Sequence, residues 1–286
     1  MDVIICGSGP AGIQAALYIK RANLEVMVIG KDGGSLSRTD KVANYFGVPV
    51  MSGPELLAIG HKQLADHEIP LVKEEITGLH MEMEGFSVIT DQNTYTAKAV
   101  ILATGSPRVS AKLKGIKELE GKGISYCAVC DAFFYRKKIV GVLGHGEYAA
   151  HEASELVNVA SQVIVFTNGL APQGHFDPRV IINTKKLKSV IGEEKVEAIE
   201  YEDGSTEALS GIFVAFGSAS SVDLAVTMGV AVEANKIVVS DKMETNVPGL
   251  YAAGDCTPGL MQISKAVGDG CVAGLSAIAY LRNGGK

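Results

Sequence analysis

The chain has 286 residues, of which 47% are apolar, so it is long enough for two hydrophobic cores and we expect two domains. Its 32 acidic residues outnumber its 26 basic ones, and the net charge of −6 argues against binding to nucleic acid or to an anionic membrane surface. No apolar run approaches 18 residues, and the chain opens on a short apolar strand without the charged segment of a secretory signal. We therefore expect a cytoplasmic protein with neither kind of partner.

The first predicted elements form one βαβ unit. An apolar strand over residues 2–6 and a strand over 25–29 flank a helix over 13–22, whose apolar residues have helical spacing. Between the first strand and the helix lies the glycine turn Gly7-Ser8-Gly9-Pro10-Ala11-Gly12. In this setting glycines let backbone amides approach a pyrophosphate at the positive end of a helix. The turn predicts a dinucleotide site, although a glycine turn can also serve packing alone.

The rest of the first half predicts one helix, one small sheet and one buried strand. A polar, glycine-rich loop over 31–40 precedes a helix over 53–67, which Ser52 and Pro54 open. Alternating residues over 76–95 indicate a small antiparallel sheet. A strand over 99–103 ends in Thr104-Gly105, where the backbone must approach a ligand or turn sharply.

The βαβ pattern begins again after about residue 113. A strand over 139–143, the turn Gly144-His145-Gly146, a helix over 147–159 and a strand over 162–167 repeat the first unit, and strands near 195–202 and 212–215 complete it. A strand over 250–253, then Gly254-Asp255 and a long apolar helix over about 263–281, return the chain to the first domain. We predict an α/β protein with two doubly wound, Rossmann-like lobes. Residues 1–112 and 243–286 form the first domain, residues 113–242 form an inserted one, and the double connection is a natural hinge.

Cys127-Ala128-Val129-Cys130 lies in the inserted domain. Two thiolates at this spacing can bind zinc or form a redox dithiol. The chain has no second Cys-x-x-Cys and no closely spaced histidine pair, which favours the dithiol and predicts no bound metal. At the start of a helix the dipole lowers the pKa of one thiol, and the thiolate can then exchange with another disulfide through a mixed disulfide.

Two further predictions concern the neighbours of this pair and the other cysteines. Asp131 fits a general acid or base for the thiols if burial raises its pKa, and it can alternatively be a helix N-cap. We expect Cys6, Cys256 and Cys271 to be small buried hydrophobic residues.

The chain resembles low-molecular-weight thioredoxin reductases nearly from end to end. The resemblance is carried, in order, by Gly7 to Gly12, Gly33-Gly34-Ser35-Leu36, Val42-Ala43-Asn44-Tyr45-Phe46-Gly47, Ala103-Thr104-Gly105, Cys127 to Asp131, and Gly254-Asp255 with Gln262. It implies a homodimer that reduces a thioredoxin, with Cys127 facing the partner and Cys130 facing a flavin. It also implies FAD held by Gly7, Ser8, Gly9, Pro10, Ala11, Gly12, Gly34, Ser35, Leu36, Asn44, Thr104, Gly105, Gly254, Asp255, Gln262 and Ile263. The family has Gln where Ser35 stands and Arg-Gln-Ala where Met261-Gln262-Ile263 stands, so one flavin contact of the family is missing.

The second glycine turn departs from the family, in which this domain binds NADPH. Glu147 places a carboxylate where the pyrophosphate would lie, and two anionic groups about 4 Å apart repel by roughly 4 kcal/mol near a protein surface. Tyr148 adds bulk, and Thr167-Asn168-Gly169 supplies neither an arginine for a 2′-phosphate nor an acid for a 2′-hydroxyl. We expect a domain that keeps the fold without the nucleotide, the alternative being a divergent site that uses backbone amides alone.

The resemblance is therefore closest to the ferredoxin-dependent branch of flavin thioredoxin reductases. It implies that electrons pass from ferredoxin through FAD and the Cys127–Cys130 pair to thioredoxin. Because ferredoxins are acidic, a basic docking surface is expected, although each basic cluster can also be an ordinary solvated face. The clusters are Arg136-Lys137-Lys138, Lys112 with Lys114, Lys117 and Lys122, and Lys185-Lys186 with Lys188.

Two other functions stay open. One is an NADPH-dependent thioredoxin reductase with a divergent nucleotide site. The other is a flavin-bound redox sensor whose dithiol signals without turnover. A ferredoxin to NADP reductase of related fold is disfavoured, because it has no use for Cys127 and Cys130.

Overall fold

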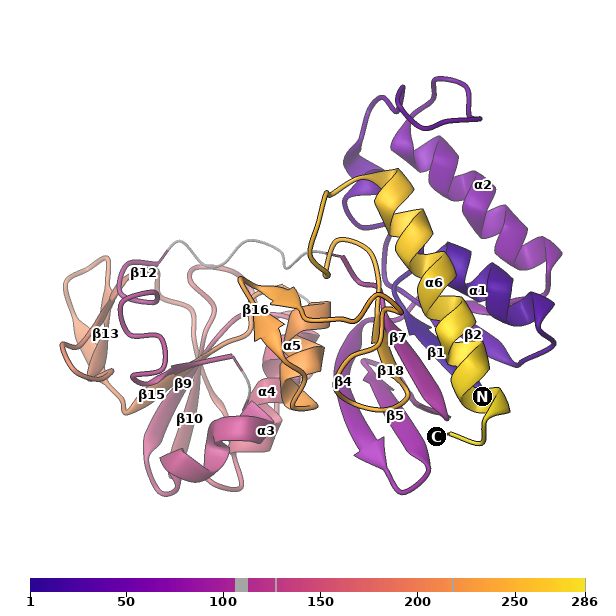
Figure 1. Ribbon diagram of the computed structural model, residues 1–286. Helices are drawn as coiled ribbons and strands as arrows, with labels where there is room; N and C mark the ends of the chain where they lie inside the picture. Colours follow the sequence, from indigo (N-terminus) through magenta and orange to yellow (C-terminus); the bar gives the residue numbers. More distant parts are fainter. Residues whose placement is uncertain (106–112, 127, 218, 286) are drawn as a thin grey trace. The chain divides into compact units, whose positions relative to one another are not determined.

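This computed structural model describes residues 1–105, 113–126, 128–217 and 219–285. The chain divides into two compact units, each built on a parallel five-stranded sheet (Figure 1). Unit 1 comprises Met1–Pro107 and Ser220–Lys286, and unit 2 comprises Arg108–Ala219. The α/β class with two Rossmann-like lobes is confirmed. Within the described ranges, no helix has both the length and the apolar character that a membrane crossing requires.

The sheet of unit 1 has the first strand of the chain at its centre. Its order is β18 (Leu250–Ala252), β7 (Ala99–Leu102), β1 (Val3–Cys6), β2 (Val26–Ile29) and β3 (Leu71–Val72), and all neighbours are parallel. Every residue of β1 and β7 is fully buried, which agrees with their uninterrupted apolar sequences. An antiparallel sheet of β4 (Ile76–Glu82), β5 (Gly85–Thr90) and β6 (Thr94–Ala97) contacts the parallel sheet through β5 and β6.

Two helices from opposite ends of the chain pack closely in unit 1. Helix α1 (Pro10–Arg21) follows β1, and helix α6 (Ile263–Arg282) follows β18. A Cβ atom on Gly270 of α6 would lie 2.1 Å from the Ala11 carbonyl oxygen, so only glycine allows this approach. The contact places the C-terminal segment beside the first glycine turn. Helix α2 (Gly53–Asp66) begins with a capping box between Ser52 and Glu55.

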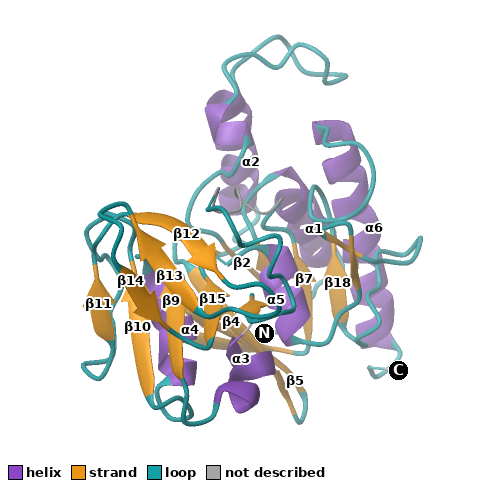
Figure 2. Ribbon diagram, turned by 90° about the vertical axis from the view of Figure 1, so that its left-hand side faces the viewer, coloured by secondary structure: helices purple, strands orange, loops and turns teal. Residues whose placement is uncertain are grey.

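The sheet of unit 2 repeats this arrangement (Figure 2). Its order is β11 (Ile181–Asn183), β10 (Gln162–Phe166), β9 (Ile139–Leu143), β15 (Gly211–Val214) and β8 (Ile124–Ser125), all parallel. The helices of this unit are α3 (Ala128–Asp131), the 3₁₀ helix η2 (Ala132–Tyr135) and α4 (Glu147–Leu156). The strand expected near 195–202 instead belongs to a separate antiparallel sheet of β12 (Leu187–Ile191), β13 (Ala198–Tyr201) and β14 (Thr206–Ala208).

The chain returns to unit 1 earlier than residue 243, where we place the boundary from sequence. Helix α5 (Ser221–Thr227) and the short hairpin of β16 (Val232–Glu233) and β17 (Lys236–Ile237) belong to unit 1. The Ile237 amide donates to the Cys256 carbonyl oxygen at 2.8 Å, and α5 packs against β4. These elements are two to seven residues long, too short for a periodic signal in the sequence.

Candidate functional site

The first glycine turn connects β1 to α1 and leaves the start of the helix open. A Cβ atom on Gly7 would lie 2.3 Å from the Ala103 carbonyl oxygen, and one on Gly12 would lie 1.9 Å from the Gly7 carbonyl oxygen. The φ angle of Gly7 is also +123°, which disfavours any side chain. A Cβ atom on Gly9, by contrast, would meet no described atom within 4 Å. The first turn of α1 has no acidic residue, so this open, positive helix end suits an anion such as a pyrophosphate.

The loop after β2 returns to this turn. The Ser8 hydroxyl donates to the Asp32 carbonyl oxygen at 3.1 Å, and the Asp32 side chain accepts from the Gly34 amide at 2.8 Å. Gly34 has φ of +62° and no described atom within 4 Å of a built Cβ. Ser35 occupies the N-cap position of the 3₁₀ helix η1 (Leu36–Arg38) without a capping hydrogen bond from its side chain, and Leu36 is buried. The predicted residues of this loop therefore lie at the same end of the sheet as the first turn.

A hydrogen bond joins two predicted residues that are far apart in sequence. The Asn44 amide Nδ2 donates to Gln262 Oε1 at 3.2 Å, although 218 positions separate them. Ile263 is the first residue of α6, so the bond ties residue 44 to the start of that helix. Met261, where the family has an arginine, has a largely exposed side chain.

Thr104 and Gly105 follow β7 and meet a residue that sequence reasoning missed. The Thr104 amide donates to Ser221 Oγ at 2.9 Å, and the two hydroxyl oxygens are 2.8 Å apart. Ser221 is fully buried at the start of α5. Gly105 has φ of +82° and no described atom near a built Cβ, so the backbone is open there.

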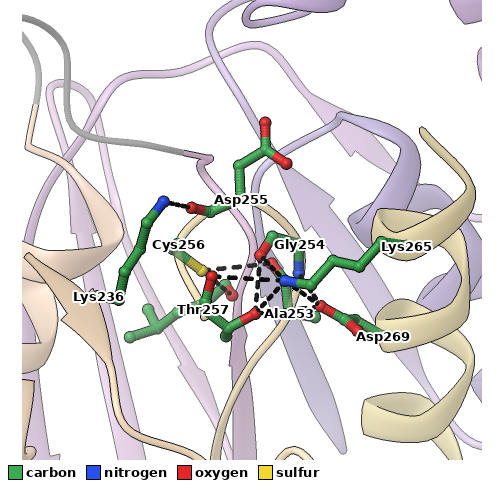
Figure 3. A network of polar contacts seen from close by, with 9 residues as sticks. Lys236, Ala253, Gly254, Asp255, Cys256, Thr257, Lys265 and Asp269 are labelled. Atoms are coloured by element: carbon green, nitrogen blue, oxygen red, sulfur yellow. Dashed lines mark hydrogen bonds and ion pairs between the residues drawn. The ribbon is translucent and has the colours of Figure 1, made fainter. Parts of the chain in front are cut away.

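Gly254 is held by a partly buried ion pair on α6 (Figure 3). Lys265 Nζ lies 2.8 Å from Asp269 Oδ2, one turn further along the helix, and donates to the Gly254 carbonyl oxygen at 2.8 Å. Asp269 Oδ2 accepts from the Gly254 amide at 3.1 Å, so the pair binds both sides of this residue. Lys236 donates to the Asp255 carbonyl oxygen, while the Asp255 side chain points away from this network in Figure 3.

Sequence reasoning missed Lys265, Asp269 and also His61 of α2, whose Nε2 is 3.1 Å from the Ser8 carbonyl oxygen. The only available signal was a Lys and an Asp at i and i+4 in an otherwise apolar helix.

Two of the three cysteines of unit 1 are deeply buried thiols of low reactivity. Cys6 and Cys256 are fully buried, and burial raises the pKa of Cys6 to about 12 and that of Cys256 to about 11. For these two, the expectation of small buried residues is confirmed. Cys271 is only half-buried, and its hydrogen bond to Tyr18 raises the pKa of the Tyr18 hydroxyl.

The dithiol is described only in part. Cys127 lies outside the described residues, and Cys130 is described only as part of the backbone of α3, which begins at Ala128. Asp131 is half-buried and ends α3, and among the described residues its side chain makes no capping hydrogen bond to η2. The N-cap role is therefore not supported. Burial, and then the charge of Asp131, raise the pKa of Tyr135.

The second glycine turn has the same backbone packing as the first but is covered by the chain itself. A Cβ atom on Gly144 would lie 2.2 Å from the Ala215 carbonyl oxygen, as close as the corresponding contact of Gly7. The amides of Gln173 and Gly174 donate to the His145 carbonyl oxygen at 2.7 and 3.2 Å. A Cβ atom on Gly174 would lie 2.5 Å from the Gly146 carbonyl oxygen, so the two backbones are in contact.

Glu147 takes part in this covering segment. Its Oε1 is 2.6 Å from His175 Nδ1, and its Oε2 accepts from the His175 amide at 3.1 Å. The Glu147 carboxylate is at the helix end where we expect it, and it also fastens residues 173–175 over the turn. Tyr148 does not obstruct the turn as expected. Its side chain is buried, and its hydroxyl donates to the Tyr126 carbonyl oxygen at 3.4 Å.

The segment after β10 closes on its own backbone. Thr167 is fully buried, and its hydroxyl donates to the Leu170 carbonyl oxygen at 2.6 Å. Asn168 has φ of +52°, and its Oδ1 accepts from the Leu187 amide at 2.9 Å. These side chains already bind protein groups at the position where a nucleotide ribose would have to be recognised.

Comparisons with known proteins cover both units. The sequence profile of the pyridine nucleotide-disulphide oxidoreductases matches residues 1–270. A thioredoxin reductase from Listeria innocua is 34% identical over 302 aligned positions, which cover 98% of this chain and 93% of that protein. The crystal structure of an atypical thioredoxin reductase from Desulfovibrio vulgaris Hildenborough has a TM-score of 0.93 at 38% identity, over 99% of this chain and 98% of that one. That of a ferredoxin-flavin thioredoxin reductase from Clostridium acetobutylicum has a TM-score of 0.73 at 34% identity, with the same two coverages.

Proposed function

Because the chain belongs to the pyridine nucleotide-disulphide oxidoreductase family, as an FAD-dependent disulfide reductase of the thioredoxin reductase type, we propose that it reduces a thioredoxin with electrons from reduced ferredoxin. The observation that carries the choice of donor is the covered second glycine turn. One similar structure is itself described as a ferredoxin-flavin thioredoxin reductase, which supports the same choice.

The first glycine turn and its surroundings fit FAD. The open backbone at Gly9, Gly34 and Gly105 leaves room at one end of the sheet, where the N-terminus of α1 favours the pyrophosphate. The other predicted contacts lie near this room. Thr104 follows β7 and Asp255 follows β18, while the hydrogen bond of Asn44 to Gln262 lies at the start of α6. Bound FAD supplies the chemistry that connects a one-electron donor to a two-electron disulfide. These residues bind and orient it, and Lys265 with Asp269 fixes the turn from which Asp255 projects.

The cysteine pair carries the exchange with thioredoxin. Two reduced ferredoxins each lose one electron, and two electrons with two protons convert the Cys127–Cys130 disulfide to two thiols. The Cys127 thiolate then attacks the thioredoxin disulfide, which forms a mixed disulfide and releases one thioredoxin thiolate. Cys130 attacks the mixed disulfide, releases the second thiolate and restores the Cys127–Cys130 disulfide. Asp131, adjacent to Cys130, is the proposed group that accepts and returns the thiol proton.

Three features of unit 2 oppose a pyridine nucleotide as donor. Residues 173–175 cover the turn, Glu147 brings a negative charge to the helix end, and Thr167 and Asn168 are engaged with the backbone. A pyrophosphate would have to displace residues 173–175, and the Glu147 carboxylate would repel it. The sequence supplies no arginine directly after β10, since residues 167–169 are Thr, Asn and Gly.

The three basic clusters differ in how much free charge they present. Lys185 pairs with Asp203 at 3.0 Å, and Lys188 pairs with Glu200 at 2.8 Å, so that cluster is largely neutralised. In the second cluster Lys112 lies outside the described residues, and Glu118 and Glu120 lie between the exposed Lys117 and Lys122.

Arg136-Lys137-Lys138 is the best candidate for the acidic ferredoxin. All three residues are exposed and directly follow η2, and in the part of the chain that the structure describes no acidic side chain pairs with them. Lys138 Nζ instead lies 5.7 Å from the centre of the Tyr135 ring. An acidic ferredoxin would therefore meet more unpaired positive charge at this cluster than at the other two.

The test is anaerobic reduction of the enzyme flavin by each donor. We expect reduced ferredoxin to bleach the flavin absorbance and to support thioredoxin reduction, with a rate that falls as ionic strength rises. NADPH and NADH at micromolar concentration should leave the spectrum unchanged. Flavin bleaching by micromolar NADPH would overturn the proposed donor, and a ferredoxin rate indifferent to salt would overturn the electrostatic docking.

A further inference from the structure

Helix α4 contacts the residues on both sides of Cys127. Glu152 Oε2 accepts from the amide of Ala128, the residue after Cys127, at 2.7 Å. The Tyr148 hydroxyl, one turn earlier on the same face of α4, donates to the carbonyl oxygen of Tyr126, the residue before Cys127, at 3.4 Å. Helices α3 and α4 lie side by side in Figure 1, in agreement with their contacts. The helix that follows the second glycine turn therefore holds the segment that carries the dithiol.

Glu152 is a buried acid of α4 that contacts the first residue of α3. Only 2% of its surface is exposed, and the nitrogen of its hydrogen bond belongs to the first residue of the helix. A carboxylate accepting this bond uses an amide that would otherwise be free to stabilise a thiolate at the same helix end. In its ionised form the buried Glu152 carboxylate is poorly screened, and it opposes the formation of a second negative charge on the neighbouring segment.

Other ionisable groups lie on the elements next to this segment. They are Asp131 at the end of α3, Tyr135 of η2, Tyr126 before the dithiol, and Tyr148 and His151 of α4. The strands of the sheet that pack against α4, β9 and β10, carry no ionisable residue. Asp131 and Glu152 are thus the acids of this cluster, and Glu152 is the more deeply buried of the two.

We propose that Glu152 is a positioning residue that anchors the dithiol segment to α4 and disfavours the thiolate form of the cysteine pair. The reduced pair is then not stabilised by ionisation near neutral pH, which makes it a stronger reductant towards a partner disulfide. This inference rests on the proposed redox role of Cys127 and Cys130.

Glu152→Gln separates the charge from the hydrogen bond, because the amide oxygen can still accept from Ala128. The full-length, FAD-loaded protein is reduced, freed of reductant anaerobically, and alkylated with iodoacetamide at several pH values, and the labelled dithiol peptide is quantified by mass spectrometry. We expect the pH midpoint of labelling to fall by about 0.5 to 1 unit, so that labelling well below the midpoint is about 3- to 10-fold faster than in the wild type. The midpoint potential of the pair should become more positive.

Two matched variants identify the cause. Glu155→Gln removes the same charge from a less buried position on α4, and Tyr148→Phe removes the hydroxyl that donates to Tyr126 without changing a charge; neither should move the pH midpoint. Glu152→Ala, which removes the charge and also frees the Ala128 amide, should lower the midpoint at least as far as Glu152→Gln does. If the Glu152→Gln profile coincides with those of the wild type and Glu155→Gln, the proposal is overturned.

A measurement on the wild type tests the anchor without any variant. The Ala128 amide should be strongly protected in hydrogen exchange of the reduced protein, and exchange at the rate of an exposed loop would contradict the anchoring by Glu152. Failure of the proposed function looks different. If the proposed function is wrong, the wild-type cysteine pair will not cycle between disulfide and dithiol. If only the role of Glu152 is wrong, the pair will still cycle, and the charge at residue 152 will not affect it.

Discussion

The two glycine turns have almost the same backbone and opposite surroundings. Each first glycine packs against the backbone at the end of a neighbouring strand. A Cβ atom added to Gly7 would lie 2.3 Å from the Ala103 carbonyl oxygen, and one added to Gly144 would lie 2.2 Å from the Ala215 carbonyl oxygen. The helix after Gly7 has no acidic residue in its first turn, whereas the helix after Gly144 begins with Glu147, which binds His175 in the covering segment. The fold requires the glycine against the strand, but a nucleotide requires a free and positive helix end. The first requirement can therefore persist after the second is lost.

The largest expected effect comes from transferring the acid of the second turn to the first. Pro10 occupies the position that corresponds to Glu147, at the first residue of its helix. In Pro10→Glu the new carboxylate should repel the FAD pyrophosphate by roughly 4 kcal/mol at about 4 Å, which weakens FAD binding about 10²- to 10³-fold. The dissociation constant is measured by titrating the apoprotein with FAD and following flavin fluorescence.

Pro10→Gln is the matched control, because it has the same size without the charge. It should bind FAD within a few-fold of the wild type, since proline at the first helical position contributes little that glutamine lacks. Equal losses in the two variants would mean that charge does not distinguish the turns.

The next effect concerns the dithiol of unit 2. Asp131→Asn should slow thioredoxin reduction about 10²-fold while FAD affinity stays unchanged, because the proposed general acid or base is lost and the first turn is untouched. Steady-state rates are measured from below to above neutral pH. Asp203→Asn, the same change in an exposed turn of unit 2, should leave the rates unaltered. Unchanged rates for Asp131→Asn across this range would remove Asp131 from the mechanism.

The thiols of unit 1 give a smaller effect that depends on pH. Burial raises the pKa of Cys6 and Cys256 to about 12 and about 11 from an ordinary value of 9.0. Below pH 9 both states of the protein keep these protons, but above it only the unfolded chain ionises. Stability should therefore fall between pH 9 and 11 by up to about 1.4 kcal/mol per pH unit for each thiol. Urea unfolding at pH 8, 9 and 10 measures this slope, and Cys6→Ala should reduce it. An unchanged slope in Cys6→Ala would contradict the shifted pKa.

The elements with a long periodic pattern could be predicted from sequence. Both βαβ units, the glycine turns and the return of the chain into α6 follow from apolar spacing and glycine positions. The strands β8, β11, β16 and β17 and the helix α5 could not, because two to seven residues do not define a period. The boundary of unit 2 was misplaced for the same reason.

The site shows a similar division. The open glycines of the first turn and the acid of the second could be identified from residue type. Two other features could not be predicted: residues 173–175 cover the second glycine turn, and Lys265 and Asp269 bind Gly254. Both depend on hydrogen bonds to backbone atoms that are distant in sequence, and no residue pattern indicates such bonds. Tyr148 was expected to add bulk at the second turn, and this prediction is wrong. Its place on α4 directs its side chain towards Tyr126 instead.

The smallest expected effect removes the acid of the second turn. His175 is 92% exposed, so its pair with Glu147 contributes little, and Glu147→Gln should lower the unfolding free energy by about 0.5 kcal/mol. His175→Gln is the matched control and should have a similar effect. NADPH should still fail to bleach the flavin of Glu147→Gln, because the amides of residues 173 and 174 still cover His145 and the segment after β10 still lacks an arginine. Flavin bleaching by micromolar NADPH in this variant would show that a single carboxylate, and not the covering segment, separates the second turn from the first.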